Sequence, residues 1–300
     1  MISICLLTYN HQDAIKNSLP HLMKQATDHF IDDIFVLDNA SDDRTVHYIK
    51  QYFSHIPIHQ QAYIKSYSAC VNKALQIARY EYVIILLPCF VSITFSIDTI
   101  KKAFQDPLLA LLSFSFISCG IHQHITLSPH FRLGVFDFKY RSLTACSQSQ
   151  NIFSFLPNAI CFRKDLCLLL GGICPNFSTA FACHEFAYRV HKRGFKILSD
   201  PHLSLRLIKP LNFKRDFLSK DHFLLFWMHN NQILYWLFHV LFIFISFIFF
   251  FLSYQRAFFS AFLRIRHVFK RPGVFVIKDK YLLSTKIYKP WNFISEVKET

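Results

Sequence analysis

Two short polar segments, 8–10 (TYN) and 38–41 (DNAS), each directly follow a run of apolar residues. The apolar runs 2–7 and 34–37 are typical of buried strands. In a parallel α/β sheet, ligands bind beyond the carboxyl ends of the strands. The two polar segments are therefore candidates for one binding site, although DNAS is also good chemistry for capping the next helix.

A third apolar run, 83–87, ends without such groups, because Pro88 and Cys89 follow it. At the corresponding edge of an α/β sheet, a catalytic site would place a carboxylate, a hydroxyl or a glycine loop. Cysteine is a poor ligand for hard cations such as Mg²⁺ or Mn²⁺, and leucine cannot bind one. This strand end therefore predicts no site for a hard divalent cation.

The apolar pattern also predicts the elements that position these residues. Strand-like runs alternate with helical patterns three times over residues 1–87, which favours a parallel sheet with helices on both faces. Further along, LLALLSFSFIS is predicted as a strand, and 119–150, rich in His, Ser and Gln, as a loop. Helices are predicted at 13–26, after Ser41 or Asp42, and at 66–79, 163–170 and 185–192.

The chain has 300 residues, 35 of them Phe, and a net charge of +14. Residues 201–300 carry 15 basic and 5 acidic side chains, whereas residues 1–100 carry 7 and 9. The basic final third favours an anionic partner, and lipid headgroups suit it better than nucleic acid because its basic groups surround an apolar run. The nine cysteines lack paired spacing and no signal peptide is recognisable, which favours a reducing, cytosolic setting.

The final third contains an apolar segment, 233–253, that is long enough to cross a bilayer. No Asp, Glu, Lys or Arg occurs between residues 222 and 255. The following segment, 254–271, combines Phe and Leu with Arg and Lys, which is typical of an amphipathic helix at a headgroup surface. A buried core helix is the alternative for the apolar segment.

Basic side chains lie on both sides of the apolar segment, so charge does not fix its topology. Positive flanks favour the cytoplasm for both ends. A re-entrant hairpin or a helix lying in the interface satisfies both flanks, and a single span stays open as a third possibility.

Three segments together resemble the family 2 glycosyltransferases, and most closely their rhamnosyltransferase-like branch. They are ISICLLTYN at the N-terminus, IFVLDNASDDRT at 34–45 and GGICPNFSTAFACHEFAYRVHKRGFKI at 171–197. The resemblance covers roughly residues 2–200, and a further segment at 222–236 is also similar. It implies a GT-A fold, a Rossmann-like and mostly parallel α/β sheet with helices on both faces, followed by C-terminal hydrophobic, membrane-associated helices.

The resemblance implies a nucleotide-sugar site at the first two strand ends. Asp38 would accept a hydrogen bond from a uracil or thymine ring N–H. The other residues implied at this site are Thr8, Tyr9, Asn10, Asn39 and Asn72. For Asn72, an exposed polar position on a helix is an equally good interpretation.

The same resemblance marks two departures from the family pattern. The metal-binding Asp-x-Asp motif falls on Leu87, Pro88 and Cys89, so a divalent cation (Mg²⁺ or Mn²⁺), usual in the family, lacks its ligands and no cofactor is assigned. The general base falls on Cys183, and Glu185 is the carboxylate that remains near this element. Glu185 is therefore the predicted catalytic residue.

Three alternatives follow for this altered site. In the first, the enzyme works without the usual metal, with Glu185 as base and basic side chains such as Arg189 on the phosphates. In the second, the domain is a degenerate glycosyltransferase that binds a nucleotide or nothing. In the third, Cys89, Cys183 and His184 form a soft-metal site.

The leading functional hypothesis is an inverting glycosyltransferase that moves a sugar, with rhamnose as the candidate, from a nucleotide-diphosphate donor to a lipid-linked or cell-envelope glycan acceptor. The alternative is a catalytically inactive, membrane-bound binding or scaffold protein. Expected partners are the donor, the acceptor and membrane lipids, but not nucleic acid. Residues 1–205 would form the glycosyltransferase-like domain and residues 206–300 the membrane-associated helical region, at the cytoplasmic face of the (inner) membrane.

Overall fold

The computed structural model describes residues 1–118, 121–144, 148–208, 219–230, 233–248 and 252–269. The strands in these ranges are β1 (Ile2–Thr8), β2 (Asp33–Asp38), β3 (Ile58–Gln60), β4 (Tyr82–Leu86), β5 (Phe90–Thr94), β6 (Leu109–Ser118), β7 (Ile121–Arg132), β8 (Val135–Thr144), β9 (Gln150–Asn151), β10 (Ala159–Arg163) and β11 (Lys196–Leu207). The helices are α1 (Gln12–Asp28), α2 (Thr45–Tyr52), α3 (Tyr67–Ile77), α4 (Ile97–Ala103), α5 (Lys164–Leu169), α6 (Thr179–Lys192), α7 (Lys220–His229), α8 (Ile233–Ile248) and α9 (Leu252–Phe269).

The strands form one mixed sheet whose main order is β3-β2-β1-β4-β10-β6-β11-β5. Strands β3, β2, β1 and β4 are parallel to one another, as the alternation of strands and helices predicts. Strand β10 runs antiparallel to both neighbours, β4 and β6, and β5 runs antiparallel to β11. Strands β6 and β11 are again parallel to each other, so the sheet beyond the first four strands is mixed, and the expectation of a mostly parallel sheet holds there only in part. Strand β10 is entered from a loop, and an antiparallel neighbour needs no crossover helix.

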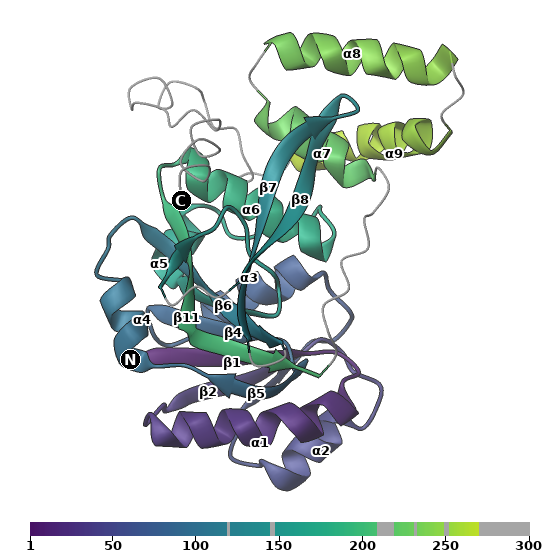
Figure 1. The fold of residues 1–300 in the computed structure, drawn as a ribbon. Coiled ribbons are helices and arrows are strands. Elements are labelled where there is room, and N and C mark those ends of the chain that lie inside the picture. Colours follow the sequence, from purple (N-terminus) through teal and green to yellow (C-terminus); the bar gives the residue numbers. More distant parts are fainter. Residues whose placement is uncertain (119–120, 145–147, 209–218, 231–232, 249–251, 270–300) are drawn as a thin grey trace.

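Helices cover both faces of the sheet (Figure 1), as predicted. Helices α1 and α2 lie on one face, and α3, α5 and α6 lie on the other. The alternation of side chains along β1 explains this layering. Ile4 and Leu6 belong to the core on the α1 face, whereas Cys5 and Leu7 belong to the core on the α3 and α6 face.

Helix α1 runs as one helix from Gln12 to Asp28, with Pro20 inside it. One prediction of local structure is wrong. The stretch predicted as a loop at 119–150 contains a long antiparallel hairpin of β7 and β8. Its two turn residues, Leu133 and Gly134, have φ angles of 49° and 77°, and two positive φ angles match the twist of a tight hairpin.

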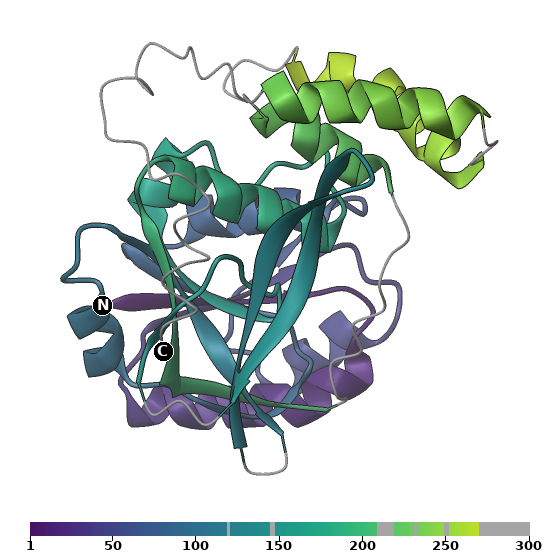
Figure 2. The same ribbon diagram turned by 45° about the horizontal axis from the view of Figure 1, so that its top comes forward.

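The C-terminal helices gather at the tip of this hairpin (Figures 1 and 2). Helix α7 is buried on nearly every side, and α8 and α9 lie outside it. The predicted apolar segment 233–253 is divided between α8 and the start of α9, and residues 249–251 lie outside the described residues. Within the described ranges, no helix combines the length and the apolar character that a membrane crossing requires.

Helix α7 contributes to the same core as the sheet. Phe223 and Phe226 belong to the apolar cluster that contains Phe186 of α6 and Val83 of β4. This shared core explains why α7 holds its place beside the sheet. The predicted division of the chain at 205/206 stays a prediction.

Candidate functional site

Thr8 and Asp38 end neighbouring parallel strands and are paired directly in register. Both side chains are buried, and the Thr8 hydroxyl has no hydrogen-bond partner among the described residues. Asp38 Oδ1 accepts from the Ser41 hydroxyl at 2.5 Å, and Oδ2 accepts from the Ser41 N–H at 3.0 Å. Asp38 therefore shapes the turn after β2, as the capping alternative expects, and it lies at the strand edge where a ligand is expected.

The loops after β1 and β2 are tied together by hydrogen bonds. The Asn10 N–H donates to Ser41 Oγ at 2.9 Å, and Asn10 Oδ1 accepts from the Asp42 N–H at 2.9 Å. Asn10 has a φ of 51°, in the left-handed region that Asn tolerates better than most residues. The two polar segments thus meet at one edge, while the nucleotide-binding roles of Thr8, Tyr9, Asn10 and Asp38 stay predictions.

The Asn39 side chain fastens a third loop to this edge. Its Nδ2 donates to the Lys65 carbonyl and its Oδ1 accepts from the Lys65 N–H, both at 2.9 Å. This loop exposes 67% of Tyr63, whose ring centroid lies 5.1 Å from Lys65 Nζ, and Tyr9 is 37% exposed. Exposed aromatic faces can stack on nucleic acid bases. Tyr63 is a candidate contact that the sequence analysis missed, because no motif marks it.

Asn72, on α3, holds the loop that follows α5. Its Nδ2 donates to the Ile173 carbonyl and its Oδ1 accepts from the Ile173 N–H, both at 2.8 Å. Gly172 has a φ of 68°, and a Cβ there would lie 2.5 Å from Asn72 Oδ1, so only glycine fits this approach. The predicted role of Asn72 in nucleotide binding stays a prediction, while its role in positioning this loop is visible.

The end of β4 is surrounded by neutral groups. The Leu87 N–H donates to the Asn158 carbonyl at 2.9 Å, and Asn158 Nδ2 donates to Cys89 Sγ at 3.1 Å. Burial raises the pKa of the Cys89 thiol, which therefore stays neutral. Nowhere in the described residues do three or more His, Cys, Asp or Glu side chains form a group that could hold a metal ion. A leucine side chain and a neutral thiol are poor ligands for Mg²⁺ or Mn²⁺, so residues 87–89 do not fit a hard divalent cation.

Glu185 lies fully buried on α6 in a bidentate ion pair with Arg189, with oxygen–nitrogen distances of 2.6 and 2.7 Å. His229 Nε2 lies 3.2 Å from Glu185 Oε1. Burial alone would raise the pKa of Glu185, but Arg189 and His229 hold it below its usual value. Burial lowers the pKa of His229, so its neutral ring donates to the carboxylate. The predicted catalytic role of Glu185 stays a prediction, because both of its oxygens are engaged.

The guanidinium group of Arg189 also donates to two backbone carbonyls. Its Nη1 donates to the Leu170 carbonyl at 2.6 Å and its Nη2 to the Gly172 carbonyl at 2.7 Å. Its side chain is only 1% exposed, so a phosphate could not reach it without displacing these partners. The phosphate-binding alternative for Arg189 is therefore wrong in this structure. Together with Asn72, Arg189 fixes the loop between α5 and α6.

Cys183 and His184 are core residues rather than metal ligands. Burial raises the pKa of the Cys183 thiol. His184 Nδ1 lies 2.8 Å from Ser154 Oγ, and burial together with nearby His222 lowers the pKa of His184 to about 3. The soft-metal alternative from Cys89, Cys183 and His184 is therefore wrong, since these side chains form no ligand group in the part of the chain that is described.

Asp221, at the start of α7, is a buried carboxylate that the sequence analysis did not single out. Its Oδ2 accepts from the Ser178 N–H, immediately before α6, at 3.0 Å. Its Oδ1 has no partner within the described ranges. A carboxylate at this position compensates the N-terminal N–H groups and the dipole of α6. The sequence signal is an Asp in the first turn of a helix, which does not reveal a contact with a distant helix.

The N-terminal part of the chain matches a known protein family. Residues 3–86, which contain β1 to β4, match the family model described as glycosyl transferase family 2. No curated protein matches the sequence. The matched region contains the polar strand ends at Thr8 and Asp38, and it stops before Leu87.

Several solved structures are similar in fold. GalNAc-T7 with UDP, GalNAc and Mn²⁺ is 12% identical, with a TM-score of 0.59 over 76% of this chain and 48% of that chain. The mannosyltransferase PcManGT from Pyrobaculum calidifontis with GDP-Man and Mn²⁺ is 16% identical, with a TM-score of 0.49 over 74% and 61%. Residues 1–349 of TarS from S. aureus are 19% identical, with a TM-score of 0.47 over 68% and 60%.

The chain therefore spans about half the length of GalNAc-T7 and about 60% of the other two. Because two of these TM-scores lie below 0.5, the assignment of the fold rests on the first structure. The resemblance to family 2 glycosyltransferases is confirmed, whereas the rhamnosyltransferase-like branch stays a prediction. Residues 3–86 thus match the model of glycosyl transferase family 2, and the described chain has a GT-A-like α/β fold.

Proposed function

We propose that this protein is a glycosyltransferase that binds a nucleotide-diphosphate sugar at the carboxyl ends of β1 and β2. The observation that carries the proposal is the in-register pair of Thr8 and Asp38, a buried hydroxyl beside a buried carboxylate, within the segment that matches the family model. GalNAc-T7, which is similar in fold, is described with UDP, GalNAc and Mn²⁺. A nucleotide is the ligand class that suits this edge best.

In this proposal, the Asp38 carboxylate accepts a hydrogen bond from a ring N–H of the base. The Thr8 hydroxyl, which lacks a partner among the described residues, gains one from the base or the ribose. A buried polar group without a partner costs about 1–3 kcal/mol, so a ligand that pairs with Thr8 recovers part of this free energy. Tyr9 and Tyr63 offer exposed rings on which the base can stack.

The transfer step breaks the bond between the anomeric carbon and the diphosphate oxygen, and the nucleoside diphosphate leaves with the electron pair. An acceptor hydroxyl oxygen attacks the opposite face, which inverts the anomeric carbon, and it loses its proton. Glu185 is the proposed recipient of that proton, which requires its ion pair with Arg189 to open. The proposal assigns no divalent cation to residues 87–89, because leucine and a neutral thiol do not suit one.

The finer part of the proposal concerns the sugar, the acceptor and the location. Rhamnose is the proposed sugar, and a lipid-linked or cell-envelope glycan at the cytoplasmic face of the (inner) membrane is the proposed acceptor. The basic final third and the apolar outer surface of α8 support a membrane setting.

A catalytically inactive, membrane-bound binding or scaffold protein is the second candidate function. Leu87 and Cys89 stand where the family has metal-binding carboxylates, and a buried thiol, Cys183, stands where it has its base. Glu185 is held by Arg189. These observations favour a protein that binds a nucleotide without turning it over.

Calorimetric titration of the purified 300-residue chain with UDP, dTDP and GDP, with and without Mn²⁺, tests the donor site. We expect binding that does not require Mn²⁺ and that weakens at least about tenfold in Asp38→Ala, since a hydrogen bond to a charged group contributes about 1.5–3 kcal/mol. Asp42→Ala, which removes an exposed carboxylate from the same loop, is the matched control and should change affinity by less than about threefold.

Two results would decide against parts of this proposal. If none of the three nucleotides binds to the folded protein, the donor site is wrong. If a nucleotide binds, but no nucleoside diphosphate is released from any nucleotide sugar offered with acceptor lipids, the inactive binding protein is the better function.

A further inference from the structure

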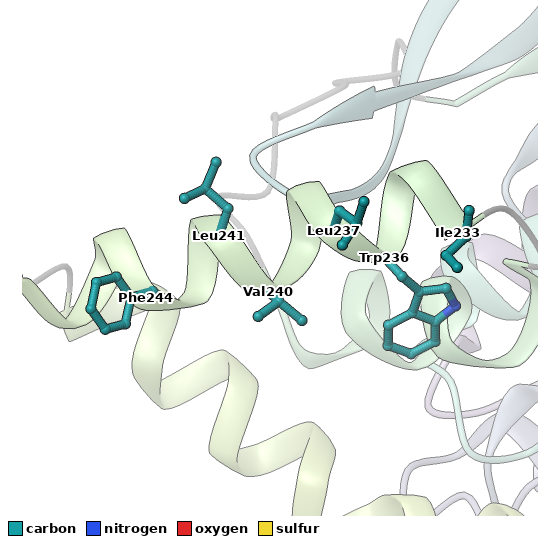
Figure 3. Close-up of a pocket in the computed structure, with 6 residues that line it drawn as sticks. All are labelled: Ile233, Trp236, Leu237, Val240, Leu241 and Phe244. Carbon is teal, nitrogen blue, oxygen red and sulfur yellow. The ribbon is translucent and has the colours of Figure 1, made fainter.

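Helix α8 turns one side toward the protein and leaves the opposite side uncovered. His239 and Ser246 are buried on the inner side. The outer side is a continuous apolar stripe, shown in Figure 3, in which Leu237 and Phe244 expose 63% and 64% of their surface. The residues of this stripe are Ile233, Trp236, Leu237, Val240, Leu241 and Phe244. Their spacing of three and four places them along one side of the helix.

His239 fixes which side of α8 faces outward. Its Nδ1 lies 2.5 Å from the Gly134 carbonyl at the tip of the β7–β8 hairpin, and its Nε2 lies 2.9 Å from Trp227 Nε1 on α7. A carbonyl only accepts and an indole N–H only donates, so the imidazole is neutral with its proton on Nδ1. Rotating α8 about its axis would break both hydrogen bonds. The two hydrogen bonds of His239 therefore keep the apolar stripe on the outer side of α8.

Helix α9 continues the same apolar face. Its inner side buries Tyr254 and Ala261, while Phe259 and Leu263 expose 50% and 73% on the outer side. The rings of Phe247, on α8, and Phe259 lie 6.2 Å apart, which joins the two helices into one surface. We call this surface, formed by the α8 stripe with Phe247, Phe259, Phe262 and Leu263, the α8–α9 face.

The α8–α9 face differs from other exposed apolar residues in the described structure. Elsewhere, large apolar side chains are exposed singly, as at Phe30, or in pairs, as at Leu168 and Leu169, which is normal for a folded protein. A contiguous apolar surface marks an interaction site. Residues 233–269 contain no Asp or Glu, and Arg256 and Arg264 are exposed on α9. The partner of this face must therefore combine apolar groups with negative charge.

We propose that the α8–α9 face binds an anionic lipid surface, with its apolar side chains at the level of the acyl chains and with Arg256 and Arg264 on the headgroup phosphates. A second copy of the chain fits less well, because a two-fold interface would contain the arginines of both copies, while residues 233–269 offer no acidic side chain to pair with them. The inference deepens the proposed function by naming the surface that would bring the protein to a membrane-bound acceptor. Lipid binding itself does not depend on the nucleotide site.

Flotation of the whole chain with phospholipid vesicles tests the proposal. We expect binding to vesicles of phosphatidylethanolamine and phosphatidylglycerol that is at least about tenfold tighter than binding to phosphatidylcholine vesicles. Leu237→Glu with Leu241→Glu should weaken binding at least about tenfold. Leu169→Glu changes a more exposed leucine on α5 and should leave binding unchanged. Arg256→Gln and Arg264→Gln should each cost about fivefold, on anionic vesicles only.

Unchanged vesicle binding in the Leu237/Leu241 variant, with its circular dichroism and melting unaltered, would overturn the proposal. So would light scattering that shows a concentration-dependent dimer, lost in this variant, together with no vesicle binding by the unchanged protein. The arginine variants keep the apolar surface intact and serve if the glutamates disturb the fold. Nucleotide titration of the same samples reports separately on the donor site, so vesicle binding without nucleotide binding would reject the proposed function and leave this inference standing.

Discussion

Two edges of the same sheet differ in chemistry. The first edge is formed by the carboxyl ends of β1 and β2, and the second edge by the carboxyl end of β4. The first edge carries Thr8 and Asp38, with a buried carboxylate and a hydroxyl that lacks a partner among the described residues. The second edge carries Leu87 and Cys89, and the Cys89 thiol stays neutral because burial raises its pKa. The family match ends at residue 86, where this difference begins. In the proposed function, the nucleotide-binding edge therefore persists without the groups that hold a metal.

Two charged side chains of α6 stabilise the loop between α5 and α6. Glu185 and Arg189 pair inside the core, and Arg189 also fixes the carbonyls of Leu170 and Gly172. Asn72 holds the next residue of the same loop, Ile173. The contrast between the proposed nucleotide-binding edge and the structural groups can be tested by changing each kind of group.

The largest effect is expected from Glu185→Ala. This change leaves the Arg189 charge buried without its partner, which should lower the free energy of unfolding by about 3–5 kcal/mol. Urea denaturation followed by circular dichroism measures it. Glu185→Leu combined with Arg189→Met removes both charges and should recover much of the loss. If Glu185→Ala keeps the original stability, the ion pair does not hold the loop, and the carboxylate is free for catalysis.

Acid should destabilise the protein through its buried histidines. The folded-state pKa of His184, about 3, lies far below its ordinary value of 6.5, so between these values the unfolded chain binds a proton that the folded chain does not. Stability should therefore fall as pH falls through this range, by about 1.4 kcal/mol per pH unit for this group. Urea titrations at several pH values measure the slope, and burial lowers the pKa of His191 and His229 in the same direction.

His184→Gln removes the titrating ring and keeps a polar group near Ser154. It should make the slope shallower by about 1.4 kcal/mol per pH unit. An identical slope in this variant would show that other groups govern the acid response.

Asn72→Ala should reduce stability and leave the donor site intact. The change removes both hydrogen bonds to Ile173, which should cost about 1–3 kcal/mol. The affinity for UDP should change by less than about threefold, because this amide serves the loop in the structure. A large loss of nucleotide affinity at normal stability would instead support the binding role predicted from the sequence.

The smallest effect is expected from giving the second edge the carboxylates that it lacks. Leu87→Asp with Cys89→Asp places two oxygen ligands after β4, which suit Mn²⁺ or Mg²⁺. Nucleotide affinity should become Mn²⁺-dependent, with a gain of about tenfold, or roughly 1.4 kcal/mol. Calorimetry with and without Mn²⁺ measures it, and Cys89→Ser is the control. No response to Mn²⁺ would mean that the two edges differ in backbone geometry as well as in side chains.

Much of the N-terminal half could be predicted from local pattern. The strands β1, β2 and β4 are continuous apolar runs, and the polar segments after β1 and β2 meet as their positions in a parallel sheet require. The β7–β8 hairpin was missed, because its strands are rich in polar residues and its turn places Leu133 at a positive φ. The pattern of apolar residues alone cannot reveal such a hairpin.

The burial and the hydrogen bonds of the candidate catalytic groups could not be predicted, because they depend on contacts between distant segments. Glu185 and Arg189 have helical spacing, but their burial comes from α7 and the loop after α5. Asp221 meets Ser178 from a separate helix, 43 residues away. Sequence spacing shows which side chains exist near an element, and tertiary packing decides which of them remain available.

The bond between Gly134 and His239 joins residues that are 105 positions apart. During synthesis, Gly134 at the hairpin tip therefore leaves the ribosome long before His239, its hydrogen-bond partner. Until then, the apolar cluster that receives Phe223 and Phe226 has no cover from α7. A newly made chain thus exposes this apolar cluster before α7 covers it, and it exposes α8 before His239 reaches the hairpin. Such an intermediate is prone to aggregate. Production in cells should depend on chaperones or on lipid present during translation.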